Sequence, residues 1–324
     1  MNGITWPDGK RFAFTVFDDT DRATADNVRG VYAMLKDLGM RTTKSVWPIR
    51  GPRSPTIPGD TCEDEAYRRW TLKLQGDGFE IGYHNATFHG VDRQDTERAL
   101  DRFAEIYGHP PIAAANHADN DDAIYWGAAR LGGVNRLAYR AMNGFRSRDF
   151  YGHVEGDRRF WGDLCRERIR YVRNFVYEDI DTLGVCPQMP YHDPARPWVN
   201  LWFASAEGAT CDAYCDTISE AAQDRLEERG GACIMYTHFA KGFEEDGRVQ
   251  PRFHRLMKRL AAKGGWFVPT STLLDHLLAQ KGRHILTPDE RAVLERTWLR
   301  QRITTRSRAL IRKKVPFASH LPLP

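Results

Sequence analysis

Two carboxylates and three imidazoles of this chain each come shortly after a run of apolar residues. They are Asp18, Asp19, His84, His89 and His238. Short apolar runs are typical of buried strands, and the carboxyl ends of parallel strands meet at one mouth of an α/β barrel. Carboxylates and imidazoles gathered at such a mouth are the metal ligands and proton carriers that a metal-assisted hydrolase needs.

The segments that must position these side chains alternate between strand and helix patterns. We expect strands over 11–17, 42–49, 79–83, 112–115, 170–177, 232–237 and 266–269. We expect helices over 25–38, 62–74, 92–107, 219–229, 251–262 and 271–280. The alternation repeats at roughly thirty residues, which favours βαβ units and a parallel sheet. A length of 324 residues suits one large α/β barrel or two ordinary domains.

Several of these segments resemble motifs of the polysaccharide deacetylases, the NodB-homology group also called carbohydrate esterase family 4. Residues 14–20 (FTVFDDT) resemble the first motif of that family, TFDD, and residues 84–89 are similar to its second motif. The strand before His238 matches the fifth motif, and residues 265–274 resemble the closing strand and helix. The resemblance covers about residues 10–280 and implies an α/β fold, a single distorted (β/α)7-type barrel.

The resemblance also implies a role for each residue of the set. Asp18 would be the catalytic base and His238 the general acid. The ligands of one divalent metal would be Asp19, His84 and His89. One carboxylate with two imidazoles suits Zn²⁺, our first expectation, and also Co²⁺, Ni²⁺ or Fe²⁺. Such a metal polarises a carbonyl and lowers the pKa of bound water from about 15.7 towards about 7.

Two features depart from the family pattern. His84 and His89 are five residues apart rather than four, which on a helix would separate the rings by about 140°. A strand-to-helix turn can accommodate the extra residue. The third motif normally supplies an arginine beside the catalytic aspartate, and the matching stretch of this chain has none. We expect substitute or additional substrate-binding residues, namely Asn116, His117, Asn120 and Asp181.

The expected reaction is hydrolysis of an amide. The metal-dependent enzyme would remove an N-acetyl or N-formyl group from an amino sugar in the biosynthesis of O-antigen, capsule or exopolysaccharide, because the departures resemble the divergent deacetylases of such gene clusters. The amino sugar would be nucleotide-linked, lipid-linked or part of an oligosaccharide. Two alternatives stay open: a metal-free hydrolase of cyclic amides or ureides with the same fold, and a non-catalytic carbohydrate-binding barrel.

The charge of the chain is unevenly distributed. Its net charge is +4, yet residues 286–324 hold nine Lys and Arg against three acidic residues. The remainder is therefore slightly acidic, which disfavours nucleic-acid binding. No apolar run approaches the roughly 20 residues of a membrane span, and the N-terminus lacks the pattern of a signal peptide. We expect a cytoplasmic location and six reduced cysteines.

The basic C-terminal segment is expected to be separate from the barrel. We predict a deacetylase barrel over 1–285 and a basic, partly helical extension over 286–324. Residues 302–314 combine basic and apolar side chains, a pattern that favours peripheral contact with an anionic membrane surface. A solvated arm, or a helix wrapped around the barrel, is the alternative.

Overall fold

Seven parallel strands close into a barrel in the computed structural model, which describes residues 3–146 and 148–314, with side chains to residue 304. They are β1 (Ala13–Asp18), β2 (Thr43–Val46), β3 (Glu80–Tyr83), β4 (Ala113–Ala114), β5 (Tyr171–Tyr177), β7 (Leu201–Ala206) and β8 (Ala232–Thr237). The order is β7-β5-β4-β3-β2-β1-β8, and the pairing of Ala206 with Met235 closes the ring. The prediction of a (β/α)7-type barrel is confirmed.

One strand was predicted at the wrong place. The expected strand 266–269 forms only an isolated bridge between Trp266 and Ala13. The seventh barrel strand is β7, a run of six buried residues for which the sequence pattern gave no prediction. β7 completes the barrel because it pairs with β5 on one side and with β8 on the other.

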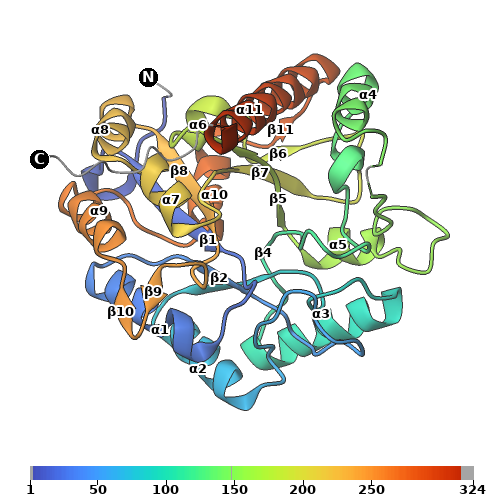
Figure 1. Ribbon diagram of the computed structural model, residues 1–324, viewed down its shortest axis with the longest axis horizontal. Helices are drawn as coiled ribbons and strands as arrows, with labels where there is room; N and C mark the ends of the chain where they lie inside the picture. Colours follow the sequence, from blue (N-terminus) through green and yellow to red (C-terminus); the bar gives the residue numbers. More distant parts are fainter. Residues whose placement is uncertain (1–2, 147, 315–324) are drawn as a thin grey trace, which may run out of the picture.

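Helices surround the barrel (Figure 1). They are α1 (Ala25–Asp37), α2 (Glu65–Gly76), α3 (Arg93–Tyr107), α4 (Gly133–Met142), α5 (Gly162–Arg168), α6 (Thr182–Val185), α7 (Cys211–Thr217), α8 (Glu220–Arg229), α9 (Pro251–Ala262), α10 (Thr270–Lys281) and α11 (Pro288–Lys314). Short 3-10 turns occupy Pro7–Gly9 (η1) and Gly127–Arg130 (η2). Two short strands, β6 (Tyr191–His192) and β11 (His284–Ile285), extend the sheet beyond β7, and β9 (Glu244–Glu245) pairs with β10 (Arg248–Val249).

The first helix shows how local sequence sets these boundaries. Thr24 and Asn27 form a reciprocal capping box at the start of α1, satisfying amide groups that have no partner within the helix. The helix ends before Gly39, whose φ of +72° is easily reached by glycine. Val28 and Leu35 are fully buried against the barrel. Capping therefore fixes where α1 begins and ends, and with it the position of the polar turn between β1 and α1.

The core is continuous, and all six cysteines are buried free thiols within it. None of the helices in residues 3–146 and 148–314 combines the length and the apolar character needed to cross a bilayer.

The first turns of α11 are attached to the barrel by a buried ionic network. Glu295 is 1% exposed and accepts hydrogen bonds from the Gly132 amide and the Asn135 side chain. Arg196 lies 3.1 Å from Glu295 and also pairs with Asp193, which in turn binds Arg291 of α11. This part of the 286–324 extension consequently lies against the barrel, close to α4 (Figure 1).

Removing Glu295 should therefore destabilise the whole protein. We expect Glu295→Ala to lower the free energy of unfolding by about 3–5 kcal/mol, because it leaves the buried Arg196 guanidinium with one carboxylate fewer. Urea unfolding followed by circular dichroism measures the change. Glu228→Ala, at an exposed position of α8, is the matched control and should stay within about 0.5 kcal/mol of the parent protein. Equal stability of the two variants would contradict the prediction.

Candidate metal centre

A cavity of about 450 Å³ lies at the carboxyl ends of the barrel strands. Its walls come from the segments that follow β1, β3, β4, β7 and β8, from β5 itself, and from α11. This is the position at which α/β barrels carry their active sites. Side chains that are remote in sequence therefore meet here, as the sequence predicted in general terms.

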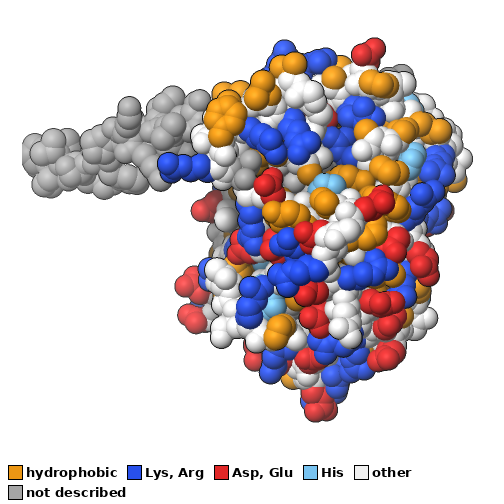
Figure 2. Space-filling model, turned by 90° about the vertical axis from the view of Figure 1, so that its right-hand side faces the viewer, with side chains coloured by type: hydrophobic (Ala, Val, Ile, Leu, Met, Phe, Trp, Pro, Cys, Tyr) orange, Lys and Arg blue, Asp and Glu red, His pale blue; other side chains and the backbone are white. Residues whose placement is uncertain are grey.

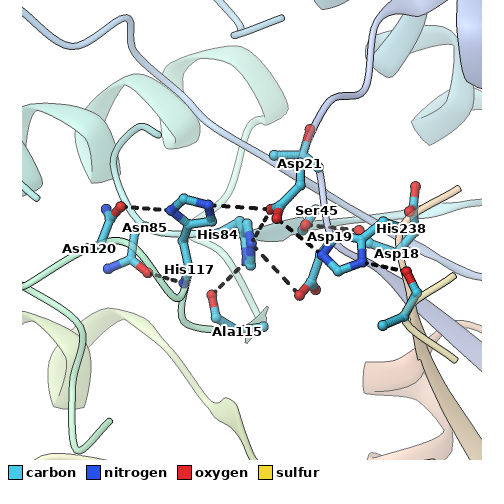
Figure 3. Close-up of polar contacts among 12 residues, drawn as sticks. Asp18, Asp19, Asp21, Ser45, His84, Asn85, Ala115, His117, Asn120 and His238 are labelled. Atoms are coloured by element: carbon cyan, nitrogen blue, oxygen red, sulfur yellow. Dashed lines mark hydrogen bonds and ion pairs between the residues drawn. The ribbon is translucent and has the colours of Figure 1, made fainter. Parts of the chain in front are cut away.

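Asp21 is the centre of the polar cluster at the base of this cavity (Figure 3). Its Oδ1 lies 3.2 Å from His84 Nε2 and 3.5 Å from His117 Nε2. Its Oδ2 lies 3.2 Å from His238 Nε2 and 3.5 Å from Lys241 Nζ. Sequence reasoning did not select Asp21. The signal it offered was a third acidic residue in the turn that follows the aspartate pair.

The other ring nitrogen of each histidine is held by an oxygen acceptor. His84 Nδ1 lies 3.0 Å from the Ala115 carbonyl, and His238 Nδ1 lies 3.0 Å from the Ala209 carbonyl. Because a carbonyl only accepts hydrogen bonds, both Nδ1 atoms must carry the proton. In a neutral imidazole the Nε2 atom then presents a lone pair to the cavity, which is the arrangement typical of a metal ligand.

Asn120 holds His117 in the same way. His117 Nδ1 lies 2.8 Å from Asn120 Oδ1, while Asn120 Nδ2 donates to the Thr87 carbonyl, which fixes the orientation of the amide. His117 Nε2 is buried and finds no hydrogen-bond partner in the described part of the chain. Burial lowers the pKa of His117, and the neighbouring His84 lowers it further. The neutral ring is therefore favoured, with its lone pair free.

These features together fit a cation. Asp21, His84 and His117 bring ligand atoms within 4.8 Å of one another, and all three residues are buried. Neutral imidazoles and a carboxylate are all acceptors, so the cluster has lone pairs but too few protons to share among them. One carboxylate and two imidazoles with room for water suit Zn²⁺ and also Co²⁺, Ni²⁺ or Fe²⁺.

His89 does not join this cluster, and the predicted ligand set needs correction there. Its Nε2 accepts a hydrogen bond from the Arg53 amide, and its Nδ1 lies 3.0 Å from the Gly90 carbonyl. The ring packs so closely on Gly51 that a Cβ atom there would lie 2.2 Å from Nε2. Since both ring nitrogens have protein partners, His89 has no lone pair to offer, and His117 stands in its place.

Asp19, the predicted third ligand, is instead paired with an arginine of β5. Arg173 binds both of its oxygens, with Nη1 to Oδ1 at 2.8 Å and Nη2 to Oδ2 at 2.5 Å. Burial opposes ionisation, but the charge and the hydrogen bonds of Arg173 outweigh it and hold the pKa of Asp19 below its usual value. Sequence reasoning did not single out Arg173, a charged residue within the largely apolar strand β5.

Asp18, the predicted base, lies outside the cavity. Its carboxylate accepts hydrogen bonds from Tyr32 Oη at 2.9 Å and the Phe239 amide at 2.8 Å, and it pairs with the buried Lys44 at 3.0 Å. Successive side chains of a strand point to opposite faces, so Asp18 and Asp19 cannot both face the cavity. Asp19 borders it, since its Oδ2 lies 3.7 Å from His84 Nε2.

The predicted wall residues are separated by the fold. Asn116 lines the cavity and forms a reciprocal pair with the backbone of Ile124, whereas Asn120 stands behind His117. Asp181 caps α6 and accepts from the Ala232 amide at the first residue of β8. That is the amino end of the strand, opposite the cavity, so the expectation of substrate contact by Asp181 is not met.

Comparisons with known proteins give structural neighbours only. No family model matches the chain, and no curated protein matches it. It is similar to a Mycobacterium smegmatis protein assigned to the polysaccharide deacetylases, with 15% identity and a TM-score of 0.48 over 88% of this chain and 96% of that one. It is also similar to Puue allantoinase, with 12% identity and a TM-score of 0.48 over 86% and 93% of the two chains. A third similar structure, from Pseudomonas aeruginosa PAO1, is again assigned to the polysaccharide deacetylases, with 11% identity and a TM-score of 0.47 over 86% and 94%.

Metal binding should depend on Asp21 and His117 and not on His89. We expect Asp21→Asn and His117→Ala each to weaken Zn²⁺ binding by at least about 100-fold, and Asn120→Ala by about 10–100-fold because it frees the imidazole that it orients. Competition titration with a chromophoric chelator measures these affinities. His89→Ala is the matched control and should bind Zn²⁺ like the parent protein. Loss of binding in that control, with Asp21→Asn unaffected, would restore the original ligand set.

Proposed function

We propose that this protein is a metal-dependent hydrolase that removes an N-acetyl or N-formyl group from an amino sugar. The observation that carries the proposal is the convergence on one cavity of a metal-type cluster, an ionised carboxylate and a further imidazole. These are Asp21 with His84 and His117, then Asp19, and finally His238. Zn²⁺ is the first candidate for the metal.

The metal would supply Lewis-acid polarisation of the amide carbonyl and acidification of a bound water. In this proposal Asp21, His84 and His117 hold it. Asp19 borders the same space and accepts the proton that the attacking water loses. Arg173 keeps that carboxylate ionised and in a fixed orientation through two parallel hydrogen bonds, which supports the assignment of Asp19 rather than Asp18 as base.

His238 would protonate the departing nitrogen. Its Nδ1 proton is held by the Ala209 carbonyl, so a second proton must sit on Nε2, the atom that faces the cavity. Asp21 Oδ2 lies 3.2 Å from that atom and can accept the hydrogen bond of an Nε2 proton. A base and an acid on separate elements around one cavity are the arrangement that amide hydrolysis needs, since the amine is a poor leaving group until it is protonated.

Aromatic side chains in the lining of the cavity support a sugar as the substrate. Trp126, Tyr139 and Trp298 line its outer part, and aromatic rings pack well on the apolar faces of sugars. We place the reaction in glycan biosynthesis in the cytoplasm, on a nucleotide-linked, lipid-linked or oligosaccharide substrate. Unmasking an amine would give the glycan a positive charge.

The activity is tested with the Zn²⁺-loaded protein and a panel of N-acetyl and N-formyl amino sugars, by measuring the acetate or formate released. We expect chelation to abolish turnover and Zn²⁺ to restore it. His238→Ala and Asp19→Asn should each lower kcat by about 10²–10⁴. His89→Ala is the control, because the His89 ring lies outside the metal cluster and has no assigned part in the reaction.

Three results would contradict the proposal. Full activity in metal-free protein on a cyclic amide or ureide would favour the metal-free alternative. Tight sugar binding without any release of acid would favour a carbohydrate-binding barrel. Unchanged turnover in His238→Ala would contradict the assignment of His238 as the acid. This variant keeps the test valid even if Asp19→Asn, which leaves the buried Arg173 without a charged partner, fails to fold.

We also propose peripheral membrane contact through residues 302–314, whose side chains beyond Thr304 lie outside those described. The basic and apolar composition of this segment supports contact with anionic lipid headgroups. Co-sedimentation with anionic liposomes measures it. Binding that persists after deletion of residues 305–324 would contradict the proposal.

A further inference from the structure

The outer wall of the cavity carries two guanidinium groups for which the catalytic proposal has no use. Arg130 of η2 and Arg302 of α11 both line the cavity. Their guanidinium carbons lie 5.1 Å and 5.5 Å from the ring centre of the same residue, Trp298. Arg130 also stacks on Trp126 at 3.7 Å. Two like charges thus share one aromatic ring at the mouth of the site.

Arg130 is buried without an ionic partner. It is 6% exposed, its Nε has no hydrogen-bond acceptor among the described residues, and its Nη1 donates to the Asn174 carbonyl at 3.4 Å. Burial and the nearby charges of Arg302, Arg173 and Arg196 lower the pKa of Arg130 to about 9. A buried charge normally has a counterion, and no described carboxylate forms an ion pair with Arg130 or Arg302.

The other two cationic side chains of the cavity already have carboxylate partners. Four cationic side chains and three carboxylates line it, namely Arg130, Arg173, Lys241 and Arg302 against Asp19, Asp21 and Glu207. Arg173 is paired with Asp19, and Lys241 lies 3.5 Å from Asp21. Glu207 accepts from the Ala209 amide and adds to the charge beside Arg173. A divalent metal would add two further positive charges, so the occupied cavity would be strongly cationic.

Acidic side chains are unevenly distributed over the side of the molecule that Figure 2 presents. They are sparse in its upper part, where α4 and α11 lie in Figure 1, and frequent in its lower part. A guanidinium stacked on an indole keeps its N–H groups in its own plane, parallel to the ring, where they are free to donate to two oxygens of one group. Carboxylates and phosphates have that geometry.

We propose that Arg130 and Arg302 form a subsite for an anionic group of the substrate, a carboxylate or a phosphate, so that the amino sugar hydrolysed here is itself charged or phosphate-linked. The assignment of this anionic group to the substrate rests on the proposed function. The binding of the anion itself does not require turnover. Arg130 supplies the buried charge, and Arg302 brings the C-terminal helix into recognition of the same group.

The test is a calorimetric titration of the full-length protein with inorganic phosphate and, separately, with glucuronate, using glucose as the neutral control. Both the Zn²⁺-loaded and the chelator-treated protein are titrated, because anions also bind metals directly. We expect Arg302→Gln to weaken anion binding on the order of tenfold in both forms, the scale of one charge-assisted hydrogen bond. Arg302→Lys should recover part of the affinity.

The exposed position of Arg302 makes its substitution safe for folding, whereas Arg130→Gln removes a buried group and serves as the second variant. Arg255→Gln, exposed on α9 and away from the cavity lining, is the matched control. Binding of phosphate alone would indicate a phosphate-linked sugar, and binding of glucuronate alone a sugar acid. Anion affinity unchanged by Arg302→Gln, or no binding of either anion, overturns the subsite. Anion binding that responds to Arg302→Gln in a protein with no amidase activity would keep the subsite and reject the proposed function.

Discussion

A shortage of protons among Asp21, His84 and His117 governs the candidate site. Three imidazole Nε2 atoms point at its two oxygens, and the opposite nitrogen of each ring is already committed to an oxygen acceptor. Acceptors facing acceptors in a buried space repel one another unless a proton or a cation stands between them. The cluster is therefore organised for a positive charge. The carbonyls of Ala115 and Ala209 and the side-chain amide of Asn120 fix the tautomers of the three rings before any ligand arrives.

Buried ion pairs on either side of the cluster keep the end of β1 in place. Asp18 faces outward to Lys44 and Tyr32, while Asp19 faces inward to Arg173. Isolated buried charges are costly, so each carboxylate requires its partner: Lys44 on the adjacent strand β2 for Asp18, and Arg173 on β5, across the barrel, for Asp19. The two pairs thereby hold the strand from both faces, and the turn that carries Asp21 begins from a fixed point.

The C-terminal helix links this centre to the outer wall of the cavity. Its first turns are held by Glu295 and Arg291, and the same stretch presents Trp298 and Arg302 to the cavity. A segment that reads as a basic extension therefore contributes to the shape and the charge of the site. Stability and recognition depend here on one helix, because the ionic network that anchors it also sets the position of its aromatic ring.

Periodicity in the sequence was sufficient for six of the seven barrel strands and for placing His84 and His238 just after strand ends, whereas the barrel itself was implied by the family resemblance. Hydrophobic alternation and capping residues are local signals, and the first helix begins and ends where Thr24 and Gly39 indicate. Local sequence signals did not show which aspartate faces the cavity. Asp18, Asp19 and Asp21 have similar surroundings in sequence, and only the pleat of β1 and the turn after it send one outward, one to Arg173 and one to the histidines.

Tertiary structure likewise decided between His89 and His117. Both follow apolar runs, but the fold gives both ring nitrogens of His89 partners in the loop that contains Arg53, and it leaves Nε2 of His117 open beside Asp21. Arg173 stayed hidden for the same reason, since a charge within an apolar strand has no visible partner until a carboxylate 154 positions away is folded against it. The sequence by itself determined which segments are strands and which side chains have the right chemistry. Their grouping into one site was decided by contacts across the barrel. Hydrogen bonds and ion pairs form there between strands that are far apart in the chain, and the distance along the chain does not indicate which side chains will meet.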